Sequence, residues 1–307
     1  MIEFKNLKLN LKSIDILNDI SFSIPKNKVC CFVGNKNTGK SSILKIIAGV
    51  YKNFYGEVYI DGVDINDNQK IKIDIINESK ENDQYLTVSE YLEFYGKIYN
   101  NKDISKYIDM MLRKFSLTSY KFTTLDNIDK ETFKLIDLIR VLLNDPDIIL
   151  FDNLFFSDNI DYNELLFDFI KTLVGKKTLV FTARNLNYIS EICDYLGVLD
   201  NGSLIAYGKR DDVFRTAEIF GRFEVEVLDR VSDAVEILRD DDNIINILYE
   251  DNNILLTIAP TSDTPKLINI KKLEYDIIKR LVDSGIKICS FKKQQVRFEH
   301  LFSRLKD

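Results

Sequence analysis

Residues 28–50 read KVCCFVGNKNTGKSSILKIIAGV, and this stretch restricts the fold of the chain more than any other. An apolar strand pattern leads into a loop bounded by Gly34 and Gly39, and an apolar-periodic helix pattern follows directly. The spacing Gly-x-x-x-x-Gly-Lys-Ser is that of a phosphate-binding loop, here in the strand-loop-helix setting that the motif requires. The alternative interpretation is a glycine-rich turn that caps a helix. The setting favours nucleotide binding over that alternative.

The expected roles of the loop residues follow from their chemistry. Backbone N–H groups of the loop surround the β-phosphate, and the N-terminus of the following helix adds positive potential. Lys40 is expected to reach the β and γ phosphates, and Ser41 is expected to ligate Mg²⁺. Asn37 stands where a third glycine is common, and Asn is one of the few side chains that tolerate a positive φ. The residues expected to bind the nucleotide are Gly34, Asn35, Lys36, Asn37, Thr38, Gly39, Lys40, Ser41 and Ser42.

Composition limits the other functions. The 307 residues are enough for one large domain and a small one, or for two domains of similar size. The 42 basic and 48 acidic residues are interleaved without a Lys/Arg block, so nucleic acid is not expected as a partner. No apolar run approaches the roughly 18 residues of a membrane span, and the N-terminus has no hydrophobic signal core. The chain is therefore expected to stay in the cytosol. The four cysteines form no CxxC pair and are interpreted as buried thiols: Cys30, Cys31, Cys193 and Cys289.

Strand and helix patterns alternate along the first two thirds of the chain. Thr87-Val-Ser-Glu90 reads as a capping box that opens a helix through about Tyr99. Further helices are expected at 104–115 and 131–143, the last one stopping before Asp145-Pro146. Beyond them, LLFDFIKTL predicts a helix, KTLVFTA a strand, NYISEICDYL a helix, and GVLDNGSLIAYG a hairpin that turns at Asn201-Gly202. Interleaved strands and helices predict an α/β core.

The pattern changes near residue 218. From there the segments predict the order β-α-β-β-α-β, followed by a helix in VRFEHLFSRL. This order indicates a ferredoxin-like module. Its single histidine, His300, cannot build a metal site alone and is interpreted as a surface or dimer contact.

The text around the phosphate loop resembles the ATP-binding subunits of ABC transporters. The resemblance rests on IEFKNLKLNLKSIDILNDISFSI before the loop, on YGEVYIDGVDI and LTVSEYLEFYGKIY after it, and on LLNDPDIILFD and KKTLVFTARNLNYISEICDYLGVLDNGSLIAYGKRDDV further on. It is greatest to the branch of drug, antibiotic and sodium exporters, which adds a small C-terminal domain, and VRFEHLFSRL continues it to the end of the chain.

This resemblance implies an architecture and a nucleotide site. The expected fold is an α/β P-loop NTPase of ABC type at 1–217, with a helical subdomain at about 87–143, and a ferredoxin-like accessory or dimerisation domain at 218–307. Asp152 would hold Mg²⁺ through water. Glu78 falls where the family has a glutamine that senses Mg²⁺ and the transmembrane partner, and a carboxylate still suits Mg²⁺. Leu11 falls on the aromatic position that stacks on adenine and offers only apolar contact.

The catalytic positions of the family depart from its pattern. Asn153 stands at the position of the catalytic glutamate, and Arg184 stands at that of the histidine that orients the γ-phosphate. Neither an amide nor a guanidinium works as a general base, so no catalytic residue is intact. The signature segment that crosses the dimer interface falls on 128–132. Asp129 would there repel a partner's γ-phosphate by about 4 kcal/mol at 4 Å and an effective dielectric near 20.

The expected function is that of an ATP-binding subunit of an ABC exporter, which binds Mg-ATP and hydrolyses it slowly or not at all. Its partners would be transmembrane permease subunits and a second ATP-binding subunit, in a heterodimer or a homodimer, at the inner face of the membrane. Three alternatives remain. The chain could be an ATP-sensing regulatory subunit, a structural subunit that binds no nucleotide, or an enzyme in which another acid such as Glu78 or Asp158 reaches the γ-phosphate.

Overall fold

The chain folds into two compact units, Met1–Lys209 and Arg210–Asp307. The structure is a computed structural model and describes residues 1–67, 71–76, 85–99, 103–153, 160–183, 189–216, 221–241, 244–258 and 270–294. The division falls before helix α7 (Arg210–Thr216), whereas the sequence predicted a boundary at 217/218. The first unit contains the phosphate loop.

A six-stranded sheet forms the centre of the first unit, in the order β10-β9-β3-β8-β7-β6. Its parallel strands β3, β7 and β8 are buried on both faces, as their continuous apolar runs predict. Only β10 runs antiparallel, paired with its neighbour β9. The bounds are β3 (Val29–Val33), β6 (Ile73–Ile76), β7 (Ile148–Asp152), β8 (Thr178–Ala183), β9 (Tyr195–Asp200) and β10 (Ser203–Lys209).

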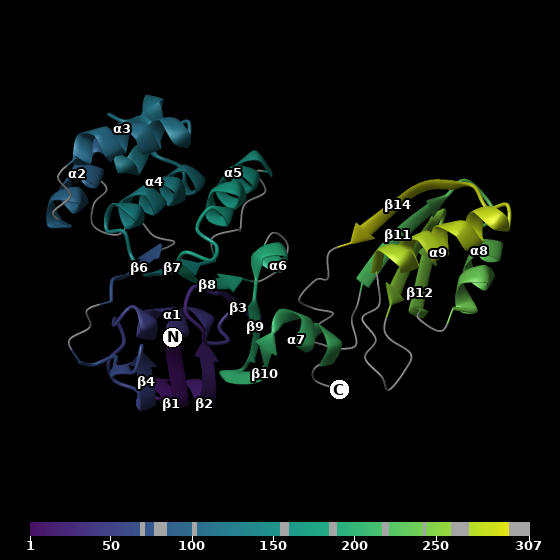
Figure 1. Ribbon diagram of the computed structural model, residues 1–307, viewed down its shortest axis with the longest axis horizontal. Coiled ribbons are helices and arrows are strands. Elements are labelled where there is room, and N and C mark those ends of the chain that lie inside the picture. The colour runs from purple at the N-terminus through teal and green to yellow at the C-terminus, as the bar shows by residue number, and fades with distance from the viewer. Residues whose placement is uncertain are drawn as a thin grey trace. The chain divides into compact units, whose positions relative to one another are not determined.

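A second, antiparallel sheet has the order β2-β1-β4-β5. Its strands are β1 (Ile2–Leu11), β2 (Ile14–Ile24), β4 (Tyr55–Ile60) and β5 (Val63–Asp64). Helix α1 (Lys40–Ile47) packs in the core between the two sheets, where its residues Ile43, Leu44, Ile46 and Ile47 are fully buried. In Figure 1, α1 lies between the sheet formed by β1, β2 and β4 and the central strands. The helix that begins at the phosphate loop is thus fixed on both sides by apolar burial.

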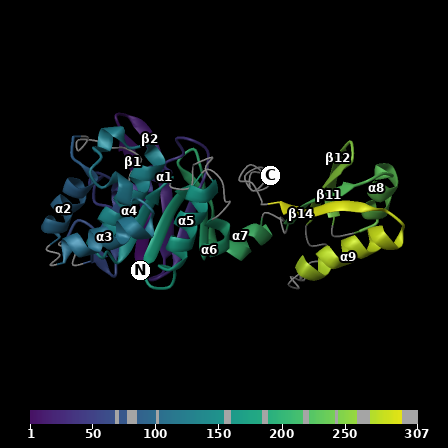
Figure 2. The same ribbon diagram turned by 90° about the horizontal axis from the view of Figure 1, so that it is seen from above.

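Three helices form a group at the β6 edge of the central sheet. They are α2 (Val88–Ile98), α3 (Ile104–Lys114) and α4 (Lys130–Leu143), with the short 3₁₀ turns η1 (Thr118–Tyr120) and η2 (Leu125–Asn127) between α3 and α4. Helix α4 contacts β6, and α2 and α3 pack against α4. Helix α5 (Ile160–Lys171) follows β7. Figure 1 shows these helices above the central sheet, and Figure 2 shows α2, α3 and α4 grouped together. The predicted capping box is present, because Thr87 and Glu90 bond reciprocally at the start of α2.

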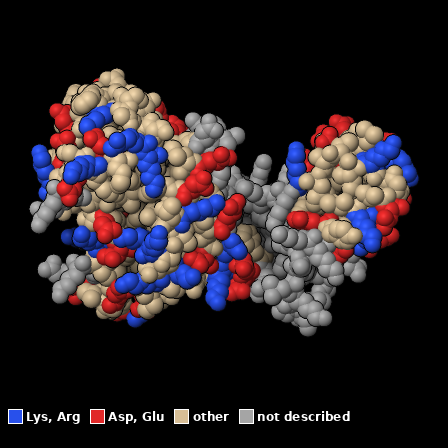
Figure 3. Space-filling view, turned by 45° about the horizontal axis from the view of Figure 1, so that its top comes forward, with Lys and Arg blue, Asp and Glu red and all other residues tan. Residues whose placement is uncertain are grey.

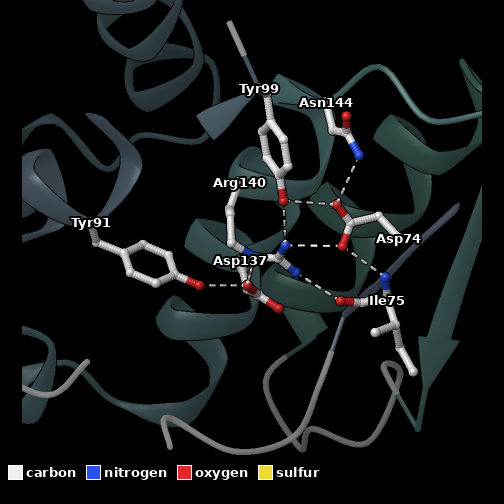
Figure 4. A network of polar contacts seen from close by, with 7 residues as sticks. All are labelled: Asp74, Ile75, Tyr91, Tyr99, Asp137, Arg140 and Asn144. Atoms are coloured by element: carbon white, nitrogen blue, oxygen red, sulfur yellow. Dashed lines mark hydrogen bonds and ion pairs between the residues drawn. The ribbon is translucent and has the colours of Figure 1, made fainter. Parts of the chain in front are cut away.

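A buried polar network joins this helical group to the edge of the sheet (Figure 4). Arg140 of α4 donates to Asp137 at 2.5 Å, to Asp74 of β6 at 2.9 Å and to the carbonyl oxygen of Ile75 at 2.7 Å. The exposed side-chain fractions are 8% for Arg140, 4% for Asp137 and 10% for Asp74. Burial alone would lower the pKa of Arg140, but the two carboxylates raise it well above its ordinary value, so the guanidinium stays charged.

Two tyrosines of α2 and its C-cap complete the network. The Tyr91 hydroxyl donates to Asp137 at 2.8 Å, and the Tyr99 hydroxyl donates to Asp74 at 3.1 Å. Burial, followed by the charge of Asp74, raises the pKa of Tyr99 to about 12. Both phenols are therefore neutral donors at physiological pH, and α2 is bonded to α4 and β6 through the same charges.

The segment after β8 differs in part from the sequence prediction. A helix over all of NYISEICDYL was predicted, but α6 covers only Ile189–Ile192 within the described residues. Tyr195 and Leu196 belong instead to β9, where they pair with Cys30 and Cys31 of β3. Pairing with a central buried strand outweighed the helical spacing of these residues. The predicted hairpin is present, with both Asn201 (φ 44°) and Gly202 (φ 78°) in the left-handed conformation of a type I′ turn.

After α7, the second unit has the element order that the sequence predicted within the described residues. It contains β11 (Gly221–Val227), α8 (Val231–Arg239), β12 (Ile244–Glu250), β13 (Asn253–Ile258), α9 (Ile270–Asp283) and β14 (Ile288–Gln294). The four strands form one antiparallel sheet in the order β12-β13-β11-β14. Its core is apolar and includes Phe223, Val225, Leu238, Leu256 and Leu281, all fully buried. The predicted last helix and His300 lie outside the described residues.

The cysteines and the surface add two observations. Cys30, Cys31 and Cys193 are buried free thiols, while Cys289 is free but exposed, against the expectation of burial. Burial raises the pKa of Cys30 and of Cys31, which keeps both neutral. Basic and acidic side chains are interspersed over the face shown in Figure 3. No helix in the described part of the chain is both long enough and apolar enough to span a membrane.

Candidate nucleotide site

Strand register brings the expected site residues to one edge of the central sheet. Val33 of β3 pairs with Ala183 of β8, and Thr182 of β8 pairs with Asp152 of β7. The carboxyl ends of these three parallel strands therefore lie side by side. In open α/β sheets this edge is where ligands bind.

The phosphate loop depends on two glycines at close approaches. A Cβ on Gly34 would lie 2.5 Å from the carbonyl oxygen of Leu199. A Cβ on Gly39, where φ is +95°, would lie 2.5 Å from the Leu17 side chain and 2.7 Å from the carbonyl oxygen of Ile16. Asn37 has φ 64°, as expected of an Asn in place of a third glycine. The loop geometry thus excludes any larger residue at its two ends.

Lys40 lies folded against its own loop. Its ammonium group donates to the carbonyl oxygens of Gly34 at 2.8 Å and Asn35 at 2.6 Å, and to Thr38 Oγ1 at 3.3 Å. Thr38 and Lys40 are buried, while Asn35, Lys36 and Asn37 are exposed and Ser41 and Ser42 are partly buried. The lysine charge is held at the mouth of α1, next to the helix N-terminus. Both features attract phosphate.

Asp152 is bonded to the phosphate-loop helix. The Ser41 hydroxyl donates to Asp152 Oδ1 at 2.9 Å, and the Thr182 hydroxyl donates to the same oxygen at 2.5 Å. A serine hydroxyl and a carboxylate this close are oxygen donors of the kind that Mg²⁺ takes beside a nucleotide phosphate. The chemistry of this pair therefore fits the metal that the family implies.

Asn153 takes up a left-handed conformation with φ 51°. Its backbone N–H donates to Thr182 Oγ1 at 3.0 Å and to the Thr182 carbonyl oxygen at 3.2 Å. Its own carbonyl oxygen accepts from the buried ammonium group of Lys134, on α4, at 3.2 Å. At the position where the family has its general base, the backbone of Asn153 thus links the end of β7 to β8 and to α4.

Sequence reasoning missed Lys134 and Thr182. Each carries a detectable signal: Lys134 is a charged residue among the apolar residues of helix α4, and Thr182 is a polar residue inside the buried strand TLVFTA. The contacts of Thr182 depend on the register between β7 and β8, and the contact of Lys134 depends on how α4 docks against the end of β7.

Asp129 caps the start of α4 with its own side chain. It accepts from the Thr132 amide at 2.8 Å and from the Thr132 hydroxyl at 2.6 Å. Partial burial works to raise the pKa of Asp129, but the bonds from Thr132 outweigh it and hold the pKa below its ordinary value. The N-terminus of α4 therefore already carries a carboxylate of this chain.

The remaining expected residues are only partly brought to the site. Leu11 is the last residue of β1, is partly buried and packs against the core cluster that includes α1. Glu78 and Arg184 lie outside the described residues.

Comparisons with known proteins identify the family. The family model described as ABC transporter matches residues 17–155, which include the loop and Asp152. The energy-coupling factor transporter ATP-binding protein EcfA1 of Mycoplasmopsis pulmonis is 30% identical over 232 residues, which are 71% of this chain and 86% of that protein. The petrobactin import ATP-binding protein YclP of Bacillus subtilis is 24% identical over 227 residues, 71% of this chain and 90% of that protein. A solved ATP-binding subunit of an ABC transporter superposes with a TM-score of 0.63 at 21% identity, covering 70% of this chain and 92% of that one. The chain therefore belongs to the ATP-binding proteins of ABC transporters.

Proposed function

We propose that this ABC transporter ATP-binding subunit holds Mg-ATP and hydrolyses it slowly or not at all. The observation that carries the proposal is the junction of Lys40, Ser41 and Asp152 at one sheet edge, next to an Asn153 that cannot titrate. Lys40 would turn from the loop carbonyls to the phosphates, and the loop amides would surround them. Ser41 and Asp152 would hold Mg²⁺, which neutralises phosphate charge when bound.

Slow turnover follows from the residues at the two catalytic positions of the family. A positioned general base contributes about 10²- to 10⁴-fold in rate, and neither Asn153 nor Arg184 supplies one. Asp129, bonded to Thr132 at the start of α4, would also disfavour a second subunit's γ-phosphate. Occupancy by ATP, more than its turnover, would then be the signal that the subunit passes on.

The proposed partners are transmembrane permease subunits and a second ATP-binding subunit, with the chain at the inner face of the membrane. The β-α-β-β-α-β order and antiparallel sheet of the second unit support its interpretation as a ferredoxin-like accessory module of 218–307. Because the exporter branch that the sequence resembles adds a small C-terminal domain, such a module supports export as the direction of transport. A relative named for petrobactin import is also 24% identical to this chain, so sequence similarity does not separate export from import. The direction of transport is tested by a flux assay of the chain together with its permease.

The test is a calorimetric titration of the purified chain with Mg-ATP, with phosphate release followed in the same samples. Wild type should bind saturably and release little phosphate, and Lys40→Ala should lose the binding. Lys45→Ala is the matched control, because it removes a lysine of the same helix whose ammonium group lies over the Tyr51 ring, away from the loop. Absence of binding in wild type would favour a structural subunit, whereas rapid turnover that depends on Lys40 would place a general base elsewhere.

A further inference from the structure

We infer that Thr182 is a positioning residue for the metal site, which holds the Asp152 carboxylate in place for Mg²⁺ through its side-chain hydroxyl. This inference rests on the proposed function, because it assigns a role within the same Mg-ATP site. Thr182 itself contacts neither the loop nor the metal in this assignment.

The hydroxyl of Thr182 makes two bonds that fix the end of β7. It donates to Asp152 Oδ1 at 2.5 Å and accepts from the backbone amide of Asn153 at 3.0 Å. Because one group bonds both to the side chain of Asp152 and to the next peptide, it sets the torsion of the carboxylate relative to the strand. Within the described residues both side-chain bonds to Asp152 fall on Oδ1, so neither occupies Oδ2.

The two hydroxyls that bond to Asp152 differ in what metal binding asks of them. Ser41 is itself a proposed Mg²⁺ ligand, so its hydroxyl has to reorient when the metal binds and is not a fixed support for the Asp152 carboxylate. Thr182 is 1% exposed and lies on the neighbouring strand, so its bond to Asp152 persists when Ser41 turns to the metal. A carboxylate held this way is pre-organised, and the ordering does not have to be supplied by the ligand.

A hydroxyl is not needed for the strand itself. The other members of β8 are apolar apart from Thr178 at its start, and all six residues of the strand are buried. Valine has nearly the shape of threonine and is common in such strands. The role of the Thr182 hydroxyl is therefore in its hydrogen bonds to Asp152 and Asn153 at the end of β7.

The test compares Thr182→Val with Thr182→Ser, and with Thr178→Val as the matched control. Thr178 lies on the same strand, is also buried, and its hydroxyl accepts from the Asn27 amide at the other end of the strand. ATP affinity is measured by calorimetry with Mg²⁺ and again with EDTA, and urea unfolding of each variant without nucleotide reports stability. Thr182→Ala is added so that the result does not depend on how valine packs.

Thr182→Val and Thr182→Ala should weaken Mg-ATP binding by roughly 10- to 100-fold, the effect of losing one hydrogen bond to a charged group. Binding in EDTA should stay at the wild-type value. Thr182→Ser should restore the Mg²⁺ effect, and Thr178→Val should leave it intact. Equal weakening with and without Mg²⁺, or no weakening at all, would overturn the inference. If wild type itself gained no affinity from Mg²⁺, the metal role of Asp152 in the proposed function would fail first, which separates the two failures.

Discussion

Replacing Arg140 by methionine tests whether the buried network holds the helical group on the sheet. The two side chains have similar length, so the variant removes the charge with little change of volume. It also removes the hydrogen bonds that Arg140 makes to four partners: Asp137, Asp74, Tyr99 and the Ile75 carbonyl oxygen. Breaking a buried ion pair by removing one partner destabilises a protein by about 3 to 5 kcal/mol. Asp74 and Asp137 would be left almost fully buried and without their cation, so the upper half of that range is expected.

The assay is urea unfolding followed by far-UV circular dichroism, since the chain has no tryptophan. Two transitions are expected from two compact units, and the one that Mg-ATP shifts to higher urea belongs to Met1–Lys209. Arg113→Met is the control: Arg113 lies exposed on α3 of the same helical group, and such surface changes stay within about 0.5 kcal/mol.

The loss of unfolding free energy in Arg140→Met relative to wild type, called the deficit below, has a pH dependence that identifies its cause. Protonation neutralises an uncompensated carboxylate, so the deficit against wild type should shrink as the pH falls from about 8 toward 5. A deficit below about 1 kcal/mol, or one that is the same at both pH values, would refute the reasoning that charge compensation is what Arg140 provides.

Two further variants test single features. Gly39→Ala should abolish nucleotide binding and destabilise the first unit more than Gly49→Ala. Both positions have positive φ, but only a Cβ at position 39 would meet other atoms within 4 Å. Calorimetry and urea unfolding measure the two effects, and equal effects of the two variants would contradict this prediction. Tyr99→Phe should flatten the loss of stability at alkaline pH. The folded pKa of about 12 lies above the ordinary 10.0, so the stabilising contribution of Tyr99 is complete below pH 10 and is lost between pH 10 and 12. Parallel slopes of unfolding free energy against pH for wild type and Tyr99→Phe would exclude this role.

Features that one segment determines by itself were predictable from the sequence. The phosphate loop, the Thr87 and Glu90 capping box and the Asn201-Gly202 turn each follow from residues within a few positions of one another. The helix boundaries at 104 and 143 were also predicted. The extension of α6 over Tyr195 was wrong because its strand pairing involves a partner more than 160 residues away, Cys30 of β3.

The candidate site divides along the same line. The sequence predicted Lys40, Ser41 and Asp152, whose motif spacing is local or follows a recognisable strand. The bonds of Thr182 to Asp152, of Lys134 to Asn153 and of Arg140 to Asp74 depend on strand register and helix docking. Such contacts have no fixed spacing in the sequence.

Helix α4 shows why those long-range contacts matter for the fold. Lys134, Asp137 and Arg140 are all under a tenth exposed, on a helix whose other buried side chains are apolar. A wholly apolar helix could rotate or slide along the sheet edge with little change in burial. A helix with these charges cannot, because any other position separates Lys134 and Arg140 from the carbonyl oxygens that they bond to at the ends of β7 and β6. The two cations would then be buried without those partners. The same charges that make α4 expensive to bury therefore determine where the helical group sits relative to the phosphate loop.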